Sequence, residues 1–306
     1  MTKLVLMPMP DNEDLAVKLA AALGGDIGSL EARRFPDGES YVRLKTDVSG
    51  RTLAIVCTLD RPDDKFLPLT FAAATARELG AARIGLVAPY LAYMRQDKRF
   101  KDGEAVTSKY FASLVSSQFD WLVTVDPHLH RYASLDEVYS IPTRVLHADP
   151  VLSEWIRANV ERPLVVGPDS ESEQWVSAVA AEAGCPYVVL SKDRHGDRDV
   201  AISVPNLSAW KERTPVLVDD IASSARTLIE ACRQLTSSGM LPPVCIAIHA
   251  LFASDAYNEL MGVAARIVTT NTVPHQTNEM DLCSLMATGI AALTSGYAPR
   301  PRTSAV

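Results

Sequence analysis

The sequence lacks paired cysteines, long apolar runs and an excess of positive charge. Its 5 cysteines are scattered and form no CxxC motif, which argues against a disulfide framework and against a zinc site. The longest uninterrupted apolar runs, such as Val244 to Ile248, fall far below the ~20 residues that cross a membrane. The opening residues, MTKLVLMPMP, carry an apolar stretch too short for a signal peptide. We therefore expect a cytoplasmic protein that does not enter a membrane.

The balance of charge narrows the classes of partner. The chain carries 30 Lys and Arg against 37 Asp and Glu, a formal net charge of −7. Because phosphate contacts need clustered cations, this balance argues against a general nucleic-acid binder. The net charge does not argue against a small anionic substrate, since binding one needs only a local cationic pocket. With 306 residues, of which 47% are hydrophobic, the composition is that of a globular protein with about two domains.

Short apolar runs alternate with amphipathic stretches along the whole chain. The expected strands are Leu4–Met7, Leu53–Val56, Ile84–Val87, Trp121–Val125, Leu164–Val166, Tyr187–Leu190, Val216–Val218, Val244–Ile248 and Arg266–Val268. The expected helices are Glu13–Leu23, Phe66–Leu79, Ser108–Ser116, Val151–Asn159, Glu173–Ala183, Ala225–Leu235 and Met280–Ala292. Strands that alternate with such helices form βαβ units and a parallel sheet, and nearly continuous apolar strands fit a sheet covered on both faces.

The strand and helix pattern runs twice along the chain. The first run ends near Ile141–Leu146, and the helix expected from Val151 opens the second. No Gly/Ser-rich linker separates the two runs. The sequence therefore predicts an α/β fold of two similar domains, residues 1–147 and 148–306, each a mainly parallel sheet flanked by helices.

Three of the expected strands run directly into acidic residues. They lead to Asp126-Pro127-His128, to Asp169 and to the pair Asp219-Asp220. In open α/β sheets, ligands bind outside the carboxyl ends of the strands, where these side chains would converge. Asp and His are suitable ligands for a divalent cation, and Mg²⁺ prefers few protein ligands together with substrate phosphates.

The segment from Val216 to Thr227 is the most informative. It reads as a strand, an acidic pair, a small-residue loop and the start of a helix. Small residues let backbone N–H groups approach a phosphate, and the helix N-terminus favours an anion. The acidic pair suits ribose hydroxyls, which are good donors to carboxylates. This arrangement resembles the ribose-phosphate loop of type I phosphoribosyltransferases and of the related ribose-phosphate pyrophosphokinases, also called PRPP synthetases.

Other segments resemble the pyrophosphokinases in particular, and they occur in the family's order at roughly its spacings. In chain order, Arg34–Glu39 resembles the nucleotide-binding hairpin and Arg95–Asp97 the ATP-contacting segment. Val125–His128 and Val166–Asp169 resemble two metal-binding strand ends, and Ser191–Arg194 resembles the catalytic loop.

The resemblance implies two phosphoribosyltransferase-like domains and a diphosphokinase reaction. The enzyme would transfer the diphosphoryl group of ATP to O1 of ribose 5-phosphate, giving PRPP and AMP with Mg²⁺ as the cofactor. Lys192 and Arg194 would be catalytic. The metal would be placed by His128 and Asp169, with Asp126 nearby.

The resemblance also assigns the substrate contacts. Those implied for ATP are Phe35, Asp37, Gly38, Glu39, Arg95, Gln96 and Asp97. Those implied for ribose 5-phosphate are Asp219, Asp220, Ser223, Ser224, Ala225, Arg226 and Thr227. In relatives, the hairpin and the Arg-Gln-Asp segment reach across a subunit contact, which implies a homo-oligomer, at least a dimer.

The sequence departs from the family pattern in places. The usual loop is Asp-Asp-x-x-Asp-Thr-x-Gly-Thr, whereas here Ser223 replaces an acid and Arg226 replaces a glycine. Arg226 either blocks close backbone approach or adds a guanidinium to the 5-phosphate. After Asp169, Glu171 and Glu173 stand where bacterial members often have a Gly-Gly turn and a basic residue. These departures predict a divergent branch and leave its sugar-phosphate specificity open.

Simpler interpretations exist for each motif. An Asp after a strand is often a turn former or a helix cap, and Asp37-Gly38 fits a plain hairpin turn. The cationic run from Arg95 to Lys101 fits a solvated loop, and the stretch from Lys192 to Arg198 fits a mobile loop, which a catalytic lid also requires. Two other functions stay open: a phosphoribosyltransferase that uses PRPP, and a non-catalytic regulatory relative.

Overall fold

The computed structural model describes residues 3–129, 131–169, 172–195, 199–203 and 207–295. It divides the chain into two compact units. Unit 1 holds the described residues up to Leu146 together with those from Cys283 onward, and unit 2 holds His147–Leu282.

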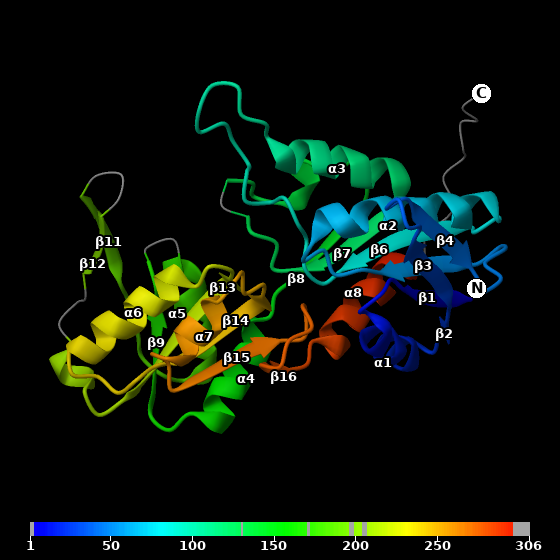
Figure 1. The fold of residues 1–306 in the computed structure, drawn as a ribbon. Coiled ribbons are helices and arrows are strands. Elements are labelled where there is room, and N and C mark those ends of the chain that lie inside the picture. The colour runs from blue at the N-terminus through cyan, green and yellow to red at the C-terminus, as the bar shows by residue number, and fades with distance from the viewer. Residues whose placement is uncertain (1–2, 130, 170–171, 196–198, 204–206, 296–306) are drawn as a thin grey trace. The chain divides into compact units, whose positions relative to one another are not determined.

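Unit 1 is built on a six-stranded parallel sheet with the order β2-β1-β5-β6-β7-β8. Its strands are β1 Leu4–Pro8, β2 Asp26–Ile27, β5 Thr52–Val56, β6 Arg83–Ala88, β7 Trp121–Val125 and β8 Thr143–Leu146. The helices are α1 Glu13–Leu23, α2 Pro62–Glu78, α3 Thr107–Gln118 and α8 Cys283–Thr294, with a short 3₁₀ turn at Leu135–Glu137. Helices α1 and α8 contact each other, as do α2 and α3, so the two pairs cover opposite faces of the sheet (Figure 1). An antiparallel hairpin, β3 Leu30–Arg34 and β4 Ser40–Leu44, is inserted between β2 and β5.

Unit 2 repeats this plan with the parallel order β10-β9-β13-β14-β15-β16. Its strands are β9 Pro163–Gly167, β10 Tyr187–Val189, β13 Thr214–Ala222, β14 Val244–Ala250, β15 Arg266–Thr270 and β16 Asn278–Met280. The helices are α4 Asp149–Asn159, α5 Glu173–Ala183, α6 Arg226–Ser237 and α7 Ala256–Met261, with a 3₁₀ turn at Ser208–Trp210. Helices α4 and α5 contact each other, and α6 contacts α7. An antiparallel ribbon, β11 Ser191–His195 and β12 Asp199–Ser203, is inserted between β10 and β13.

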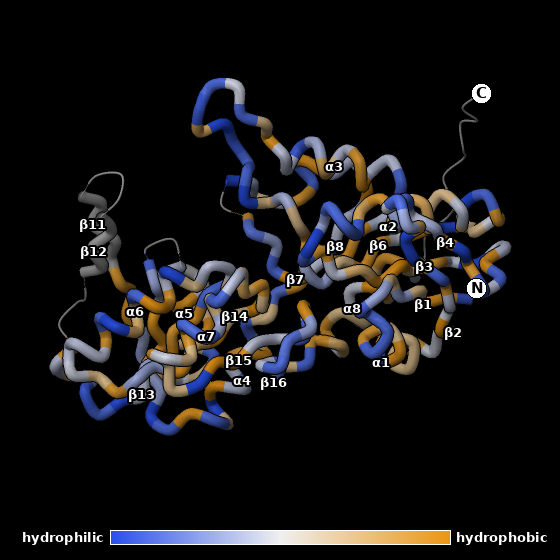
Figure 2. Tube along the Cα trace, in the orientation of Figure 1, coloured by the Kyte–Doolittle hydropathy of each residue, from blue (hydrophilic) through white to orange (hydrophobic). Residues whose placement is uncertain are grey.

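The sheets are covered on both faces, which explains their apolar strands. Strands β5, β7 and β14 are buried along their whole lengths. Figure 2 shows the hydrophobic residues gathered along the strands of each unit. Packing is close at Gly85 of β6, where a Cβ atom would lie 1.9 Å from the Trp121 ring on the neighbouring strand. The predicted α/β class with parallel sheets is therefore confirmed.

In each sheet, the side on which the chain adds its next strand changes once, and we call the place where it changes the reversal point. In unit 1 the chain places β2 on one side of β1 and β5 on the other. In unit 2 it places β10 on one side of β9 and β13 on the other. Such a reversal leaves a crevice at the carboxyl ends of the two central strands, which is where open α/β sheets bind ligands.

The end of the chain departs from the predicted domain division. The sequence places everything after residue 147 in the second domain, but the structure joins α8 to unit 1. The buried side of α8 lies against unit 1, and a Cβ on Gly289 would approach the side chains of Leu146 and Val123 at 2.9 and 3.3 Å. The Arg83 guanidinium also donates to the carbonyl of Leu293 at 3.2 Å.

The helix expected from Met280 begins later than predicted. Met280 ends β16, where it is buried, and its carbonyl accepts a hydrogen bond from the Asn271 amide at 3.0 Å. Asn271 also accepts from the Leu282 amide at 2.9 Å, so the chain turns there and α8 starts at Cys283. Among the helices in the described ranges, none is long and apolar enough to cross a membrane.

Candidate active site

The acidic pair Asp219-Asp220 lies at the reversal point of unit 2. The sequence places both acids after the strand, but β13 continues through them to Ala222, and Asp219 lies opposite Ala247 of β14. Both side chains are half-buried, and the Asp220 amide donates to the Asp219 carboxylate at 3.0 Å. Strand pairing therefore fixes the backbone that carries the two carboxylates.

The small-residue loop connects β13 to α6. The Ser223 carbonyl accepts a hydrogen bond from the Ala253 amide at 3.0 Å, which ties the loop to the end of β14. Ala225 is buried and has φ 52°, a left-handed conformation that residues with a Cβ adopt at a cost of ~1 kcal/mol or more. Ser224 is exposed, Thr227 is half-buried, and Arg226 is exposed as the first residue of α6. The strained position is thus Ala225, and Arg226 stands on the surface of the helix start.

The other strand at this reversal point, β9, leads into a tight turn before α5. The Asp169 carbonyl accepts from the Ser172 hydroxyl at 2.6 Å and from the Ser172 amide at 3.2 Å. Gly167 is required here, because a Cβ on it would lie 2.4 Å from the Ser172 hydroxyl oxygen. Glu173 is exposed in the first turn of α5, and Glu171 lies outside the described residues.

Lys192 and Arg194 lie on a strand, where the sequence indicated an irregular loop. Both belong to β11, in which Lys192 pairs with Ile202 and Arg194 with Val200. The ribbon starts immediately beyond the carboxyl end of β10, since the Leu190 amide still donates to the Gly167 carbonyl at 2.9 Å. The ribbon therefore leaves the same sheet edge that carries Asp169 and the acidic pair.

In unit 1, the expected metal ligands follow β7. Asp126 has φ 33°, and its amide donates to the Leu146 carbonyl at 2.9 Å. Asp126 and His128 are half-buried on either side of the buried Pro127. Within the described ranges, no group of three or more His, Cys, Asp or Glu side chains gathers into a ready-made metal cluster. A carboxylate and an imidazole at a strand end fit a cation such as Mg²⁺, which keeps few protein ligands and is held largely by substrate phosphates.

The segment Phe35–Glu39 forms the turn of the β3–β4 hairpin. The Phe35 amide donates to the Glu39 carbonyl at 2.8 Å, and the Gly38 amide donates to the Phe35 carbonyl at 2.9 Å. Gly38 has φ 95°, which explains the glycine, and the Asp37 carboxylate accepts from the Glu39 amide at 3.2 Å. The plain turn interpretation is therefore correct for the backbone.

The same turn presents an aromatic ring. Phe35 is 40% exposed, and its ring meets the Tyr41 ring edge-on at 6.0 Å between centroids. The Arg33 guanidinium lies 4.7 Å from the Phe35 centroid and 4.3 Å from the Tyr41 centroid. A rigid, exposed ring backed by a cation suits a planar base.

The Arg95–Asp97 segment lies between β6 and α3, and its three side chains are in different environments. Figure 2 shows a long hydrophilic stretch between these elements. Arg95 is exposed and Gln96 is half-buried, with the Gln96 side-chain oxygen accepting from the Thr107 hydroxyl at 3.4 Å. Only 3% of the Asp97 side chain is exposed, and its carboxylate accepts from the Arg131 guanidinium at 2.7 Å. Asp97 therefore anchors the segment through its buried carboxylate, whereas the Arg95 side chain is exposed.

Two residues that hold the candidate site were missed by the sequence reasoning. Arg131 neutralises Asp97, and the Tyr132 hydroxyl donates to the Asp97 carbonyl at 3.2 Å. Both lie more than thirty residues away along the chain, so no local motif reveals them. The charge of Asp97, placed in an otherwise cationic run, is the only local signal that it needs a partner.

Comparison with known proteins decides the family. A model of the N-terminal domain of ribose phosphate pyrophosphokinase matches residues 4–118, and a phosphoribosyl transferase domain model matches residues 134–281. The ribose-phosphate pyrophosphokinase of Sulfolobus acidocaldarius is 33% identical over 87% of this chain and 91% of that protein. This chain belongs to the ribose-phosphate pyrophosphokinase family. A relative of the same description from Methanopyrus kandleri is 30% identical over 95% of this chain and 100% of its own length.

The fold agrees with this assignment. The crystal structure of phosphoribosylpyrophosphate synthetase from Mycobacterium smegmatis covers 96% of this chain with a TM-score of 0.84 at 23% identity. As a ribose-phosphate pyrophosphokinase, the chain is an enzyme of PRPP synthesis. The match to the N-terminal pyrophosphokinase domain contains both the hairpin turn and the Arg95–Asp97 segment.

Proposed function

We propose that this enzyme transfers the β,γ-diphosphoryl group of ATP to O1 of ribose 5-phosphate, giving PRPP and AMP. The observation that carries the proposal is the unit 2 sheet edge, where the acidic pair, the small-residue loop and the start of the β11–β12 ribbon come together. The relatives' shared description as ribose-phosphate pyrophosphokinases supports the same reaction.

The sugar phosphate would bind at the reversal point of unit 2. The carboxylates of Asp219 and Asp220, half-buried and fixed by strand pairing, accept hydrogen bonds from ribose hydroxyls. Backbone N–H groups and hydroxyls from Ser223 to Thr227 hold the 5-phosphate ahead of α6, a helix of 12 residues. The exposed Arg226 guanidinium stands at the same helix end and adds a cation to the phosphate side.

The nucleotide would be held by the hairpin turn and the Arg95–Asp97 segment. The Phe35 ring stacks on adenine, and the exposed Asp37 and Glu39 accept from its polar edge or from the ribose. Arg95 and Gln96 contact the nucleotide, positioned by the buried pair of Asp97 with Arg131.

Mg²⁺ is the proposed cofactor, with Asp126 and His128 as its candidate ligands in unit 1 and Asp169 as its candidate ligand in unit 2. When bound, the ion neutralises the polyphosphate and orients it. The chain's own part is to present the few oxygen and nitrogen ligands that Mg²⁺ keeps beside phosphate oxygens.

In the transfer step, O1 of the sugar attacks the β-phosphorus. The bond from O1 to the β-phosphorus forms, and the bond from that phosphorus to the α,β-bridging oxygen breaks. AMP leaves with the bridging oxygen, and the O1 proton is released. Lys192 and Arg194 stabilise the charge that develops on the β-phosphoryl oxygens and on the departing AMP.

We also propose a homo-oligomer in the cytoplasm. The outer surfaces of α2 and α3 expose Leu67, Phe71 and Leu114, which are apolar side chains that a subunit contact would cover. The resemblance places the nucleotide hairpin at a subunit contact. The 5 cysteines all lie in the described ranges and form no disulfide there, which fits a reducing compartment.

Phosphorus NMR of the protein with ATP, Mg²⁺ and ribose 5-phosphate tests the reaction. We expect AMP and a sugar 1-diphosphate to appear together, and only when the sugar phosphate is present. ADP would instead show simple kinase chemistry. ATP binding without any product would indicate a regulatory relative, and conversion of PRPP with a free base would indicate a phosphoribosyltransferase.

A further inference from the structure

Unit 1 has a pocket at its own reversal point. Its volume is about 430 Å³, and it is lined by residues that follow β1, by the end of β3 and by the first turns of α2. These elements surround the carboxyl ends of β1 and β5, the strands between which the sheet reverses. The pocket is therefore the topological counterpart of the candidate sugar-phosphate site in unit 2, and of the family motifs only the hairpin contributes to it, through Arg34.

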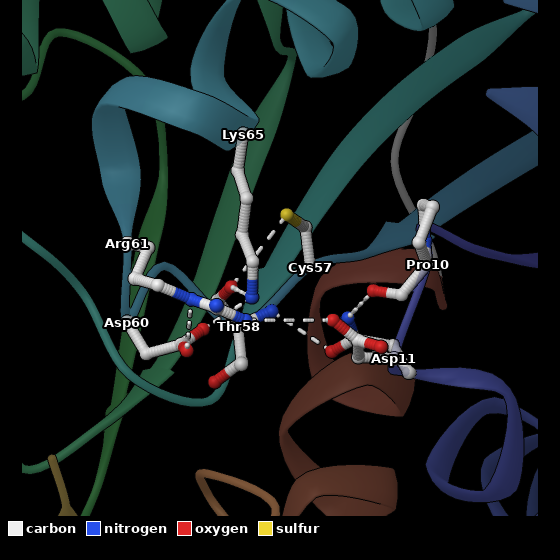
Figure 3. Close-up of polar contacts among 8 residues, drawn as sticks. Pro10, Asp11, Cys57, Thr58, Asp60, Arg61 and Lys65 are labelled. Carbon is white, nitrogen blue, oxygen red and sulfur yellow. Dashed lines mark hydrogen bonds and ion pairs between the residues drawn. The ribbon is translucent and has the colours of Figure 1, made fainter. Parts of the chain in front are cut away.

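A fixed polar network, drawn in Figure 3, adjoins the pocket through Pro10 and Lys65, which line it. The buried Asn12 side chain donates to the Pro10 carbonyl at 2.9 Å and accepts from the Thr58 amide at 2.8 Å, which ties the β1 loop to the β5 loop. Lys65 donates to the Thr58 carbonyl at 3.1 Å and forms an ion pair with Asp60. The Lys65 and Asp60 side chains are only 14% and 16% exposed, so this pair neutralises itself and serves as structure.

The rim of the pocket carries exposed charges of both signs. Arg34 forms an ion pair with Asp64 at 2.8 Å, and Arg61 lies 3.9 Å from Asp11. All four side chains are more than half exposed. Exposed ion pairs of this kind contribute ~0–1 kcal/mol, so a ligand can replace them at little cost. Arg33 also lines the pocket, and its guanidinium is paired with Glu31 at 3.5 Å, so the charges around the rim are balanced.

The backbone at the rim is strained. Asp11 has φ 69°, although it is not a glycine, and it directly precedes the buried Asn12, which is hydrogen-bonded to Thr58. A left-handed aspartate costs roughly 1 kcal/mol or more, and such positions cluster at ligand clamps. The strain keeps the Asp11 carboxylate beside the pocket, opposite Arg61.

We propose that this pocket is a second binding site for a phosphorylated sugar. The guanidiniums of Arg34 and Arg61 bind the phosphate, since arginine matches phosphate oxygens with two parallel hydrogen bonds. The carboxylates of Asp11 and Asp64 accept from sugar hydroxyls. A bare anion leaves these carboxylates without donors and meets their repulsion, whereas a sugar phosphate satisfies both kinds of group. The volume lies within the range of ~300–1,000 Å³ that is typical of small-ligand sites.

The site is separate from the proposed diphosphoryl transfer and can be tested without turnover. Met9 lines the pocket and is 3% exposed, so its methyl group reports on this site alone. Met240 and Met280, both buried in unit 2, serve as reference methyls away from the pocket. We would label the methionine methyls of the full chain with ¹³C, assign Met9 with the Met9→Leu variant, and titrate ribose 5-phosphate without ATP.

We expect the Met9 resonance to shift and saturate with ribose 5-phosphate. The Arg61→Gln variant should weaken this response ~10-fold, because a charge-assisted hydrogen bond is lost, and should leave the Met240 and Met280 responses unchanged. Arg43→Gln is the matched control, since Arg43 is an exposed arginine of the same hairpin that does not line the pocket. This control should bind like the wild type.

Several outcomes would overturn the proposal. A Met9 resonance that stays in place throughout the titration would show that the pocket does not bind ribose 5-phosphate. Equal affinity for inorganic phosphate and ribose 5-phosphate would show that the pocket recognises the phosphate group and not the sugar. An unchanged Met9 response in Arg61→Gln would show indirect coupling from unit 2. None of these results bears on AMP formation, which is measured separately and tests the proposed function.

Discussion

The two units share a topology but differ in the loops at their reversal points. In unit 2 the loop between β13 and α6 is made of Ser223, Ser224 and Ala225, and it presents backbone and hydroxyls. In unit 1 the corresponding connection, from β5 to α2, carries Asp60 and Arg61 and presents charged side chains. The shared fold thus places a candidate site at the same point of each unit, and the loops give the two sites different chemistry.

The inserted ribbons extend the comparison. Both units insert an antiparallel pair between the second and third strands of the sheet, β3–β4 in unit 1 and β11–β12 in unit 2. Unit 1 places its candidate nucleotide contacts in the turn, at Phe35–Glu39. Unit 2 places its candidate catalytic cations on the first strand of the ribbon, at Lys192 and Arg194. In the proposed function, the same insertion therefore serves binding in one unit and chemistry in the other.

Removing the cations of the unit 2 ribbon should have the largest effect. We expect Lys192→Ala and Arg194→Ala to lower kcat by ~10²–10³, with a much smaller change in KM for ATP, because the lost stabilisation belongs to the transition state. Steady-state AMP formation measures both parameters. Lys211→Ala, an exposed lysine after the 3₁₀ turn of unit 2, is the control and should behave like the wild type. A large rise in KM for ATP with kcat unchanged would contradict this, because it would show that the two cations bind ATP without stabilising the transition state.

Neutralising the acidic pair should show that the unit 2 reversal point holds the sugar. We expect Asp220→Asn to lower kcat/KM for ribose 5-phosphate by ~10-fold or more, since a carboxylate accepts hydroxyl hydrogen bonds more strongly than an amide oxygen. KM for ATP should change little. Asp64→Asn in the unit 1 pocket is the matched variant and should leave kcat/KM for ribose 5-phosphate in turnover unchanged. Equal losses from both variants would contradict the division of roles between the units.

Breaking the Asp97–Arg131 pair should affect unit 1 alone. We expect Asp97→Ala to raise KM for ATP several-fold and to destabilise the protein by about 2 kcal/mol, because it leaves Arg131 without its partner at a half-exposed site. The Arg131→Ala variant should act in the same direction, and the double variant should cost less than the sum of the two single changes. Urea unfolding and ATP kinetics measure these effects. Additive losses would show that the pair does not act as a unit.

A smaller effect should appear in the pH dependence of unit 2. His275 packs against Phe252 and Tyr257 at 4.9 and 5.1 Å between ring centroids, and burial lowers its pKa. The folded state therefore prefers the neutral ring, while the unfolded chain takes up a proton near pH ~6.5. The stability that His275 contributes is present above that pH and is lost as the pH falls through it. Urea unfolding at pH 7.5 and 5.5 should show a smaller loss in His275→Gln than in the wild type, and parallel losses would contradict this.

Much of the fold follows from the sequence because apolar runs and their spacing are local signals. The strand Trp121–Val125 and the helices Glu13–Leu23 and Glu173–Ala183 lie where the pattern predicts them. The short elements were missed for a physical reason. Strands such as β2 and β16 have two or three residues, so they carry no periodicity of their own and exist only through pairing with a neighbour.

Sequence patterns reveal the candidate site only in part. The motif residues could be found because their chemistry is contiguous, as in Asp219-Asp220 or Arg95-Gln96. The ion pair of Asp97 with Arg131 could not, because it joins residues 34 positions apart. Helix α8 shows the same limit at a larger scale: its return to unit 1 depends on distant contacts near Leu146, and nothing in its own sequence indicates them.

The most direct test of diphosphoryl transfer follows one oxygen atom of ATP. ATP labelled with ¹⁸O at the α,β-bridging position would be turned over with ribose 5-phosphate, and the phosphorus NMR isotope shifts of the products would be recorded. We predict that all of the label appears in AMP and none in PRPP, because attack at the β-phosphorus breaks its bond to that oxygen. Label in the sugar product, or label retained in ADP, would contradict diphosphoryl transfer at the unit 2 site.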